Sequence, residues 1–350
     1  MTPPGTPIQV DIRHFSMGDR LSGPECGDEA RLAAHRTPWI ASLHASMGYP
    51  AYLIEARDDS GILGVLPLCL VSGPIFGKFL VSLPYVNTGG CWTTNPAAAA
   101  AMIDAACELA DQKDVKYLEL RHEAPFDHPK FNFTRTDKVH MRLELPETPE
   151  ALLASFKAKV RSQIKKSGTY PSEVTFGKHD QLEAFYDVFA INMRDLGTPV
   201  FSKRLFARIL DQFDDDAELC VVRRDDEAIA GALLVHNNGV TEVPSASTLR
   251  AHNRSGVNMW MYRHLLDRAI QRGSHTFDFG RSSEGSGTYK FKKQWGAVAH
   301  PATWQYYVRK GSPEDMKPDS DGKQTLVKIW QKLPVWLTRR IGPPIVRGIP

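Results

Sequence analysis

The sequence has few cysteines, and they are not arranged as a disulfide framework or a metal site. Five cysteines are scattered along 350 residues without a C-x-x-C pair. An odd, dispersed set of this kind argues against disulfides and zinc, so we expect a reducing compartment and no metal. The N-terminus lacks a basic segment followed by an apolar stretch, which predicts no signal peptide. The longest uncharged run, Gly61 to Gly77, is short for a bilayer span. We therefore expect a cytoplasmic protein.

Several common catalytic and cofactor motifs are also missing. The stretch Gly73 to Phe79 is one residue short of a P-loop and lacks its Ser or Thr. Gly285-Ser-Gly287 lacks the third glycine of a dinucleotide loop. No H-E-x-x-H or G-x-S-x-G motif occurs. These absences argue against nucleotide hydrolysis, Rossmann oxidoreductases, metal hydrolysis and serine hydrolases, and we expect no tightly bound cofactor.

Positive charge is concentrated at the C-terminal end. The net charge is +3, and six basic residues and no acid follow Gly322. The pattern predicts a basic amphipathic helix over Thr325 to Leu337, shortened by Pro334. This tail either lies on anionic lipid, giving peripheral contact with the inner membrane, or docks on the protein's own body. The apolar positions on one face of the expected helix are Leu326, Ile329, Trp330, Leu333 and Leu337.

The order of expected elements repeats along the chain. A chain of 350 residues favours two domains. Each half reads as strands, a hairpin, a helix and a further strand, which predicts a mixed α/β fold in two tandem copies. We place the domains at residues 1–147 and 148–310, with a linker and tail over 311–350. The expected helices are 38–46, 95–113, 151–166, 181–196, 203–213 and 257–273, and the expected strands are 10–15, 51–56, 62–71, 78–83, 117–121, 174–176, 218–223, 228–236, 240–246 and 275–279.

One block has an unusual local composition. The expected strand Phe277-Asp-Phe-Gly-Arg281 is followed by a small-residue loop and then by Tyr289-Lys-Phe-Lys-Lys-Gln-Trp-Gly296. With Pro38-Trp39, Ser82-Leu-Pro-Tyr-Val86 and Asn192-Met-Arg-Asp-Leu-Gly-Thr-Pro199, this block resembles the Fem family of peptidoglycan interpeptide-bridge aminoacyltransferases. The resemblance is particularly to Fem relatives found beside exosortase exopolysaccharide systems, and it covers roughly residues 8 to 308.

The resemblance implies two GNAT-like acyltransferase domains. It also implies transfer of an aminoacyl group from aminoacyl-tRNA to an amine of a cell-envelope precursor, of peptidoglycan or exopolysaccharide type. More distant relatives use other activated donors, so an acyl-CoA-dependent N-acyltransferase stays open. A non-catalytic protein that binds an envelope precursor is a further alternative.

Amide formation requires aligned reactants, removal of a proton and stabilisation of an oxyanion. The resemblance assigns Lys292 to the oxyanion or a terminal phosphate, with Phe291 beside it as a substrate contact. Alternatively, Lys292 lies on the solvated face of a short helix. Asp278 is expected to act as a base or to orient Arg281, which would contact substrate, or else to cap a turn. Tyr289 positions a donor or relays a proton, or packs beneath the loop.

Four further residues are candidates for substrate binding. The resemblance places Arg194 in a cleft, where it would grip a phosphate; a surface ion pair is the alternative. Gly256 and Asn258 lie at the start of an expected helix, where backbone amides bind a donor's phosphates. The acetyl-CoA pattern needs further glycines there, and only Gly256 is present. Arg161 belongs to a basic helix that suits a tRNA acceptor stem or forms a solvated face.

Overall fold

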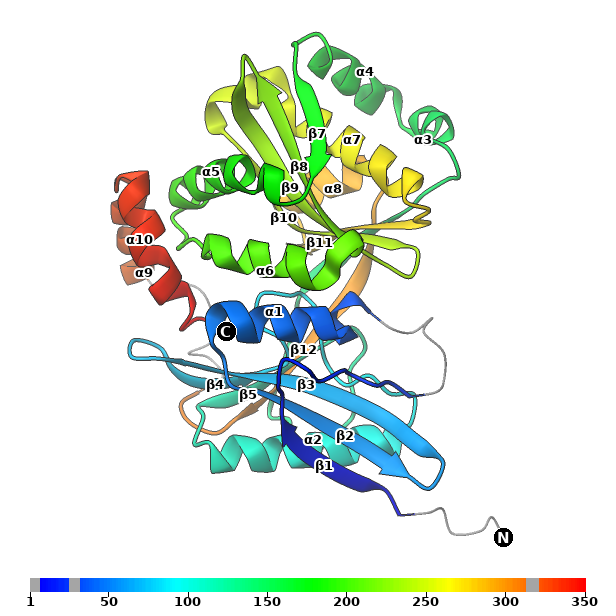
Figure 1. Ribbon diagram of the computed structural model, residues 1–350, viewed down its shortest axis with the longest axis vertical. Coiled ribbons are helices and arrows are strands. Elements are labelled where there is room, and N and C mark those ends of the chain that lie inside the picture. The colour runs from blue at the N-terminus through cyan, green and yellow to red at the C-terminus, as the bar shows by residue number, and fades with distance from the viewer. Residues whose placement is uncertain (1–6, 25–31, 313–320) are drawn as a thin grey trace. The chain divides into compact units, whose positions relative to one another are not determined.

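The computed structural model describes residues 7–24, 32–312 and 321–350 (Figure 1). Cys26 and most of the expected linker lie outside the described residues. The chain divides into two compact units. Unit 1 comprises Met1–Lys138, Pro301–Pro318 and Arg347–Pro350, and unit 2 comprises Val139–His300 and Asp319–Val346. These crossing points differ from the domain limits expected at residues 147 and 310, because two long strands each run from one unit into the other.

Unit 1 is a mixed β-sheet with two α-helices, α1 and α2. Neighbouring strands are antiparallel, except for the parallel pair β4 and β5, which α2 joins. The unit also takes in the end of β12, which pairs with β5 over Thr303–Val308. Its elements are β1 (Gln9–His14), η2 (Ala33–His35), α1 (Thr37–Met47), β2 (Ala51–Asp58), β3 (Gly61–Gly73), β4 (Gly77–Val81), α2 (Pro96–Gln112), β5 (Tyr117–His122) and β12 (Val298–Val308).

Unit 2 repeats this order of strands. Three antiparallel pairs are followed by the parallel pair β10 and β11, joined by α7, and β6 lies next to β11. The predicted mixed α/β fold in two tandem copies is thus confirmed. The elements are β6 (Phe133–Glu144), α3 (Pro149–Ser155), α4 (Ala158–Ser167), β7 (Glu173–Gly177), α5 (His179–Leu196), α6 (Lys203–Phe213), η3 (Asp214–Asp216), β8 (Ala217–Arg224), β9 (Glu227–Asn237), β10 (Val240–Thr248), η4 (Arg250–Ser255), α7 (Val257–Gln271), β11 (Thr276–Ser283) and α8 (Gly287–Gln294).

The helix expected over 151–166 is two helices, so that prediction was wrong in one respect. Phe156 and Lys157 are extended, with ψ angles of 146° and 149°, and separate α3 from α4. Phe156 turns inward and packs edge-on against Trp295, with ring centroids 5.2 Å apart. Arg161 donates to the carbonyl of Phe156 and holds the break. Burial of one aromatic ring therefore overrides helix propensity.

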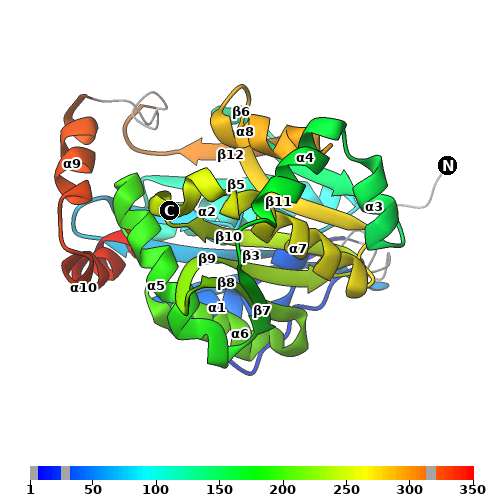
Figure 2. The same cartoon turned by 90° about the horizontal axis from the view of Figure 1, so that it is seen from above.

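The expected tail helix is also divided, into α9 (Asp321–Gln331) and α10 (Val335–Val346), because Pro334 interrupts it. Both helices lie beside α5 within unit 2 (Figures 1 and 2). Gln331 donates to the carbonyl of Asp195, and Arg339 pairs with Asp187. The tail thus docks on the protein's own body. Its expected apolar face is split, since Trp330 is half-buried while Leu326 and Ile329 stay exposed.

No helix among the described residues is long and apolar enough to cross a membrane.

A buried ionic network ties α7 to the sheet of unit 2. Arg268 donates two hydrogen bonds of 2.8 Å to Glu218, and the His236 ring lies 3.1 Å from the same carboxylate. Burial alone would raise the pKa of Glu218, but the hydrogen bonds from His236 and Arg268 lower it to about 2. The carboxylate therefore stabilises the fold at neutral pH.

We expect Glu218→Gln to lower the free energy of unfolding at pH 7 by about 1–3 kcal/mol, since an amide weakens the charge-assisted bonds. The pKa of Glu218 is lowered in the folded state, so its contribution is complete above about 4.5 and is lost as the pH falls towards 2. Urea unfolding from pH 7 to pH 3 measures this. A variant as acid-sensitive as the wild type would contradict the assignment.

Candidate functional site

The two parallel strands of unit 2 separate after a short paired stretch. β10 and β11 pair only from Val240 and Thr276 to Glu242 and Asp278. The register of β10 against β9 shifts between Glu242 and Ser245, and the intervening Pro244 has no N–H to donate. On the other strand, Gly280 has a φ of +76°, which bends β11. The two strands therefore diverge and leave a gap towards the start of α7.

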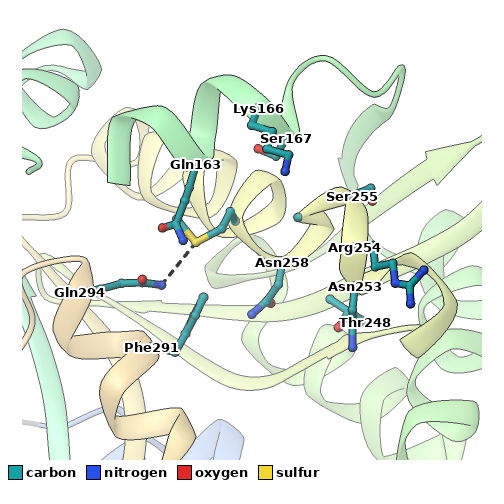
Figure 3. A pocket seen from close by; sticks show the side chains of 12 residues that line it. Gln163, Lys166, Ser167, Thr248, Asn253, Arg254, Ser255, Asn258, Phe291 and Gln294 are labelled. Carbon is teal, nitrogen blue, oxygen red and sulfur yellow. Dashed lines mark hydrogen bonds between the residues drawn. The ribbon is translucent and has the colours of Figure 1, made fainter. Parts of the chain in front are cut away.

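A pocket of about 530 Å³ lies at this end of the strands (Figure 3). Side chains from α4, the end of β10, η4, the start of α7 and α8 line it. Apolar walls come from Met259 and Phe291, and Gln294 donates to the sulfur of Met259 at 3.4 Å. The other lining residues are Gly256 and eight polar residues, Gln163, Lys166, Ser167, Thr248, Asn253, Arg254, Ser255 and Asn258.

The N-terminus of α7 faces the pocket without a side-chain cap. Gly256 is the N-cap residue, with a φ of +71°, and no acidic residue lies in the first turn. A Cβ at this glycine would lie 3.2 Å from Cβ of Ser167, so both conformation and space favour glycine. The first backbone N–H groups of a helix attract anions. The exposed Lys166 and Arg254 add two positive charges at the rim, so the pocket suits a phosphate-bearing donor.

The corresponding place in unit 1 is filled by the chain itself. After β4, the loop from Ser82 to Gly90 bonds to β5: Ser82 N–H donates to Glu119, and the N–H groups of Gly89 and Gly90 donate to Arg121. The side chain of Asn95 accepts from the N–H groups of Ala97 and Ala98 at the start of α2. Unit 1 therefore keeps the fold with this end of its parallel strands closed, and we infer that unit 2 holds the donor.

We expect Asn95→Ala to lower the free energy of unfolding by about 1 kcal/mol, the usual effect of losing an N-cap. If unit 2 holds the donor, as we infer, the rate of acyl transfer should not change. Thermal unfolding and an initial-rate assay on the same preparation measure both effects. A fall in donor affinity without a fall in stability would contradict the assignment of the donor to unit 2.

Lys292 lies in α8 and is almost fully buried, with 8% of its surface exposed. Its ammonium donates to the carbonyls of Gly280 and Arg281, each at 3.0 Å, and so holds the bend of β11. Burial lowers the pKa of Lys292 to about 8; Asp278 opposes this effect and Arg281 adds to it. The alternative, in which Lys292 lies on a solvated helix face, is therefore wrong, whereas its assignment to the reaction stays a prediction.

Asp278 is buried on the strand that Lys292 holds. Its carboxylate accepts from Nε of Arg142 at 2.9 Å and from the N–H of Gly280 at 2.7 Å. Arg142 lies 136 positions earlier, on β6, and nothing in the local sequence connected it with Asp278. Asp278 thus fixes β11 against β6 and stabilises the bend at Gly280. A positioning role fits these contacts better than that of a base.

Tyr289 and Phe291 are both partly buried on α8 against the core of unit 2. Tyr289 is half-buried against the core of unit 2, and the ammonium of Lys293 lies 5.5 Å from its ring centre. Phe291 lines the pocket and packs edge-on against Tyr262. Of this pair, only Phe291 is placed to touch a ligand in the pocket.

The three arginine candidates are not among the residues that line the pocket. Arg161 holds the break between α3 and α4. Arg194 pairs with Asp195 at 2.6 Å and donates to the carbonyl of Leu333 in the tail. Arg281 is half-buried on β11, where its carbonyl accepts from Lys292. Substrate contacts for these residues stay predictions.

Sequence reasoning missed several of the residues that line the pocket. Gln163 and Thr248 come from elements that are distant in sequence and were not singled out. Gln294 lies in the block Tyr289–Gly296, but no role was assigned to it. Arg254 adjoins the expected helix start and could have been recognised as a cation beside a phosphate site. No group of three His, Cys, Asp or Glu side chains in the part of the chain that the structure describes is placed to hold a metal ion.

Comparison with known proteins agrees with this geometry. Residues 154–293 match the model of the acetyltransferase (GNAT) domain, a region that includes Lys292 and every pocket-lining residue except Gln294. A search of curated proteins finds no match. The match and the fold support a GNAT-type N-acyltransferase.

Solved structures show the same architecture over most of the chain. FemX is 16% identical, with a TM-score of 0.62, and the match covers 92% of this chain and 100% of FemX. A tandem GNAT protein from the clavulanic acid biosynthesis pathway is 11% identical, with a TM-score of 0.51, covering 87% and 100%. L-PGS from Bacillus licheniformis is 12% identical, with a TM-score of 0.51, covering 79% and 88%. These similarities establish the fold, and the link to exosortase systems stays a prediction.

Proposed function

We propose that the protein transfers an aminoacyl group from aminoacyl-tRNA to an amine of a cell-envelope precursor. The observation that carries this proposal is the pocket at the uncapped start of α7, which adjoins the basic helix α4. The structural similarity to FemX over 92% of the chain also supports this proposal.

The distribution of charge favours tRNA as the donor. Lys166 and Arg254 are placed to meet phosphates at the pocket. The basic surface then continues along α4, whose exposed side chains include Lys159 and Lys165, and α4 contains no acid. A coenzyme has few phosphates and would leave most of this helix unused, whereas an acceptor stem has a phosphate at every nucleotide.

The chemistry is a direct displacement. The acceptor amine attacks the ester carbonyl of the aminoacyl-tRNA, a C–N bond forms and the ester C–O bond breaks. The amine loses a proton, and the departing ribose hydroxyl gains one. In the proposal, the Lys292 ammonium turns one N–H towards the oxyanion, while Asp278 and Arg142 hold β11 in place. Donors fixed before the reaction stabilise such charge most effectively.

A direct test uses purified protein, tRNA charged with labelled amino acids, and a nucleotide-linked peptide precursor with a free amine. We expect transfer of label to the precursor, and we expect ribonuclease treatment of the donor to abolish it. Labelled acetyl-CoA in place of charged tRNA is the comparison. Transfer from acetyl-CoA alone, or binding of the precursor without any transfer, would overturn the proposal.

An acyl-CoA donor is the second candidate, and the match of residues 154–293 to the acetyltransferase (GNAT) domain favours it. The phosphates of coenzyme A would also fit the start of α7. A rise in melting temperature with coenzyme A, lost in Gly256→Val, would support this candidate over tRNA.

A further inference from the structure

The C-terminal tail uses only one side of its helices to dock on unit 2. Val327, Trp330 and Gln331 are the less exposed positions of α9 next to α5. In α10 the buried positions are Thr338, Gly342 and Val346, spaced four residues apart, and the backbone of Gly342 approaches Val200 closely. Each tail helix also has exposed positions, which are Thr325, Leu326, Lys328 and Ile329 in α9 and Trp336, Arg340 and Pro344 in α10. Each helix therefore has a second side that is open to solvent.

That second side is both apolar and basic. Leu326, Ile329 and Trp336 are exposed by 67%, 55% and 68%, and are among the most exposed large hydrophobic side chains of the described residues. Lys328 is exposed next to Ile329 in α9, the exposed Lys332 directly follows the end of α9, and Arg340 follows Trp336 by one turn of α10. The sequence has no acid after Asp321. We call these six residues the tail surface.

We propose that the tail surface binds the interface of an anionic lipid bilayer, so that the protein sits on a membrane without crossing it. Exposed Leu, Ile and Trp side chains gain by entering the boundary between headgroups and acyl chains, where tryptophan is favoured. Lysine and arginine beside them meet the lipid phosphates. The proposal is independent of the donor, but would place an acyltransferase next to lipid-linked acceptors.

Charge disfavours a second copy of the chain as the occupant. In a two-fold symmetric dimer, the same patch meets itself. Lys328, Lys332 and Arg340 would then face their own copies without an acid among them. An anionic bilayer compensates those charges, whereas a second tail surface repels them.

The test is flotation of the full-length protein with lipid vesicles. We expect recovery with vesicles of phosphatidylcholine containing phosphatidylglycerol, and little recovery with phosphatidylcholine alone. Replacing Lys328, Lys332 and Arg340 with glutamine should weaken binding to the anionic vesicles roughly 100-fold, at about fivefold for each charge. Replacing Leu326, Ile329 and Trp336 with serine should abolish recovery.

A matched control replaces three exposed hydrophobic residues elsewhere, Met17, Ile75 and Val298, with serine. This control should float like the wild type, and circular dichroism should show all variants folded. Equal flotation of wild type and both tail variants would overturn the proposal. So would a dimer in sedimentation equilibrium that the tail variants dissociate, because the tail surface would then be an interface between copies.

Discussion

Lys292→Met is expected to lower kcat for acyl transfer by roughly 10²–10³-fold, the usual effect of removing one oxyanion donor. KM for the donor should change little, because Lys292 is not among the residues that line the pocket. Methionine retains the length and apolar stem of lysine. It leaves the carbonyls of Gly280 and Arg281 without this donor, which costs about 1–3 kcal/mol of stability. Rates are therefore compared well below the melting temperature of the variant.

Lys293→Met is the matched control, since Lys293 is the next residue, is exposed, and has its ammonium 5.5 Å from the ring centre of Tyr289. It should keep the wild-type kcat. The opposite result, full activity in Lys292→Met and lost activity in Lys293→Met, would contradict this prediction. Lys292 would then have a structural role alone. Lys292→Arg should restore part of the rate if a positive N–H donor is what the reaction needs.

The pH dependence of stability gives an independent check on the burial of Lys292. Its folded pKa is about 8, below the 10.5 of an exposed lysine. Between these values the unfolded chain binds more protons than the folded one, so the stability of the wild type should rise with pH. Lys292→Met should lack this rise. In the rate profile, loss of the ammonium above pH 8 should lower kcat, and Lys292→Arg should extend activity to higher pH.

The second large effect is expected at the pocket rim. Replacing Lys166 and Arg254 together with alanine should raise KM for the donor about 10–100-fold with kcat little changed, because charge-assisted bonds to phosphate bind the ground state and transition state alike. Lys159→Ala removes a charge from the same helix away from the pocket lining, and should raise KM for a tRNA donor only slightly.

Salt separates the two donors in this experiment. For tRNA, the wild-type KM should rise steeply with salt concentration, and the Lys166 and Arg254 double variant should show a shallower slope. A donor that meets only the helix start should show a weak dependence. Unchanged KM in the double variant would remove the pocket from donor binding.

The sequence was most informative where structure is local. The alternation of strands, the helix between the last two strands of each half, and the glycine at Gly256 all follow from near neighbours, and each was found. The strands β6 and β12 were not predicted, because their pairing partners are distant in sequence. The chain order of strands does not reveal that the end of β12 completes the sheet of unit 1.

In the candidate site, too, some residues could be identified from the local sequence and others could not. Sequence singled out Lys292, Asp278, Gly256, Asn258 and Phe291, and the structure places three of these at one pocket and two at the bend of β11. Gln163, Lys166 and Arg142 reach these places from other elements, and no spacing rule links them. The open end of β10 and β11 also depends on the register shift beside Pro244, which the sequence analysis did not single out.

By itself, the sequence determined a mixed α/β protein of two like halves, and it singled out a block around Lys292 by resemblance to a family of acyltransferases. Tertiary structure alone decided that Lys292 is buried, that unit 2 has the open helix start while Asn95 closes the one in unit 1, and that the tail docks through one side and exposes the other. The physical reason is that composition and periodicity fix which residues prefer to be buried. Long-range packing decides which backbone groups are already hydrogen-bonded, and so which can bind a ligand. It also decides which apolar and basic side chains stay exposed and can contact a membrane.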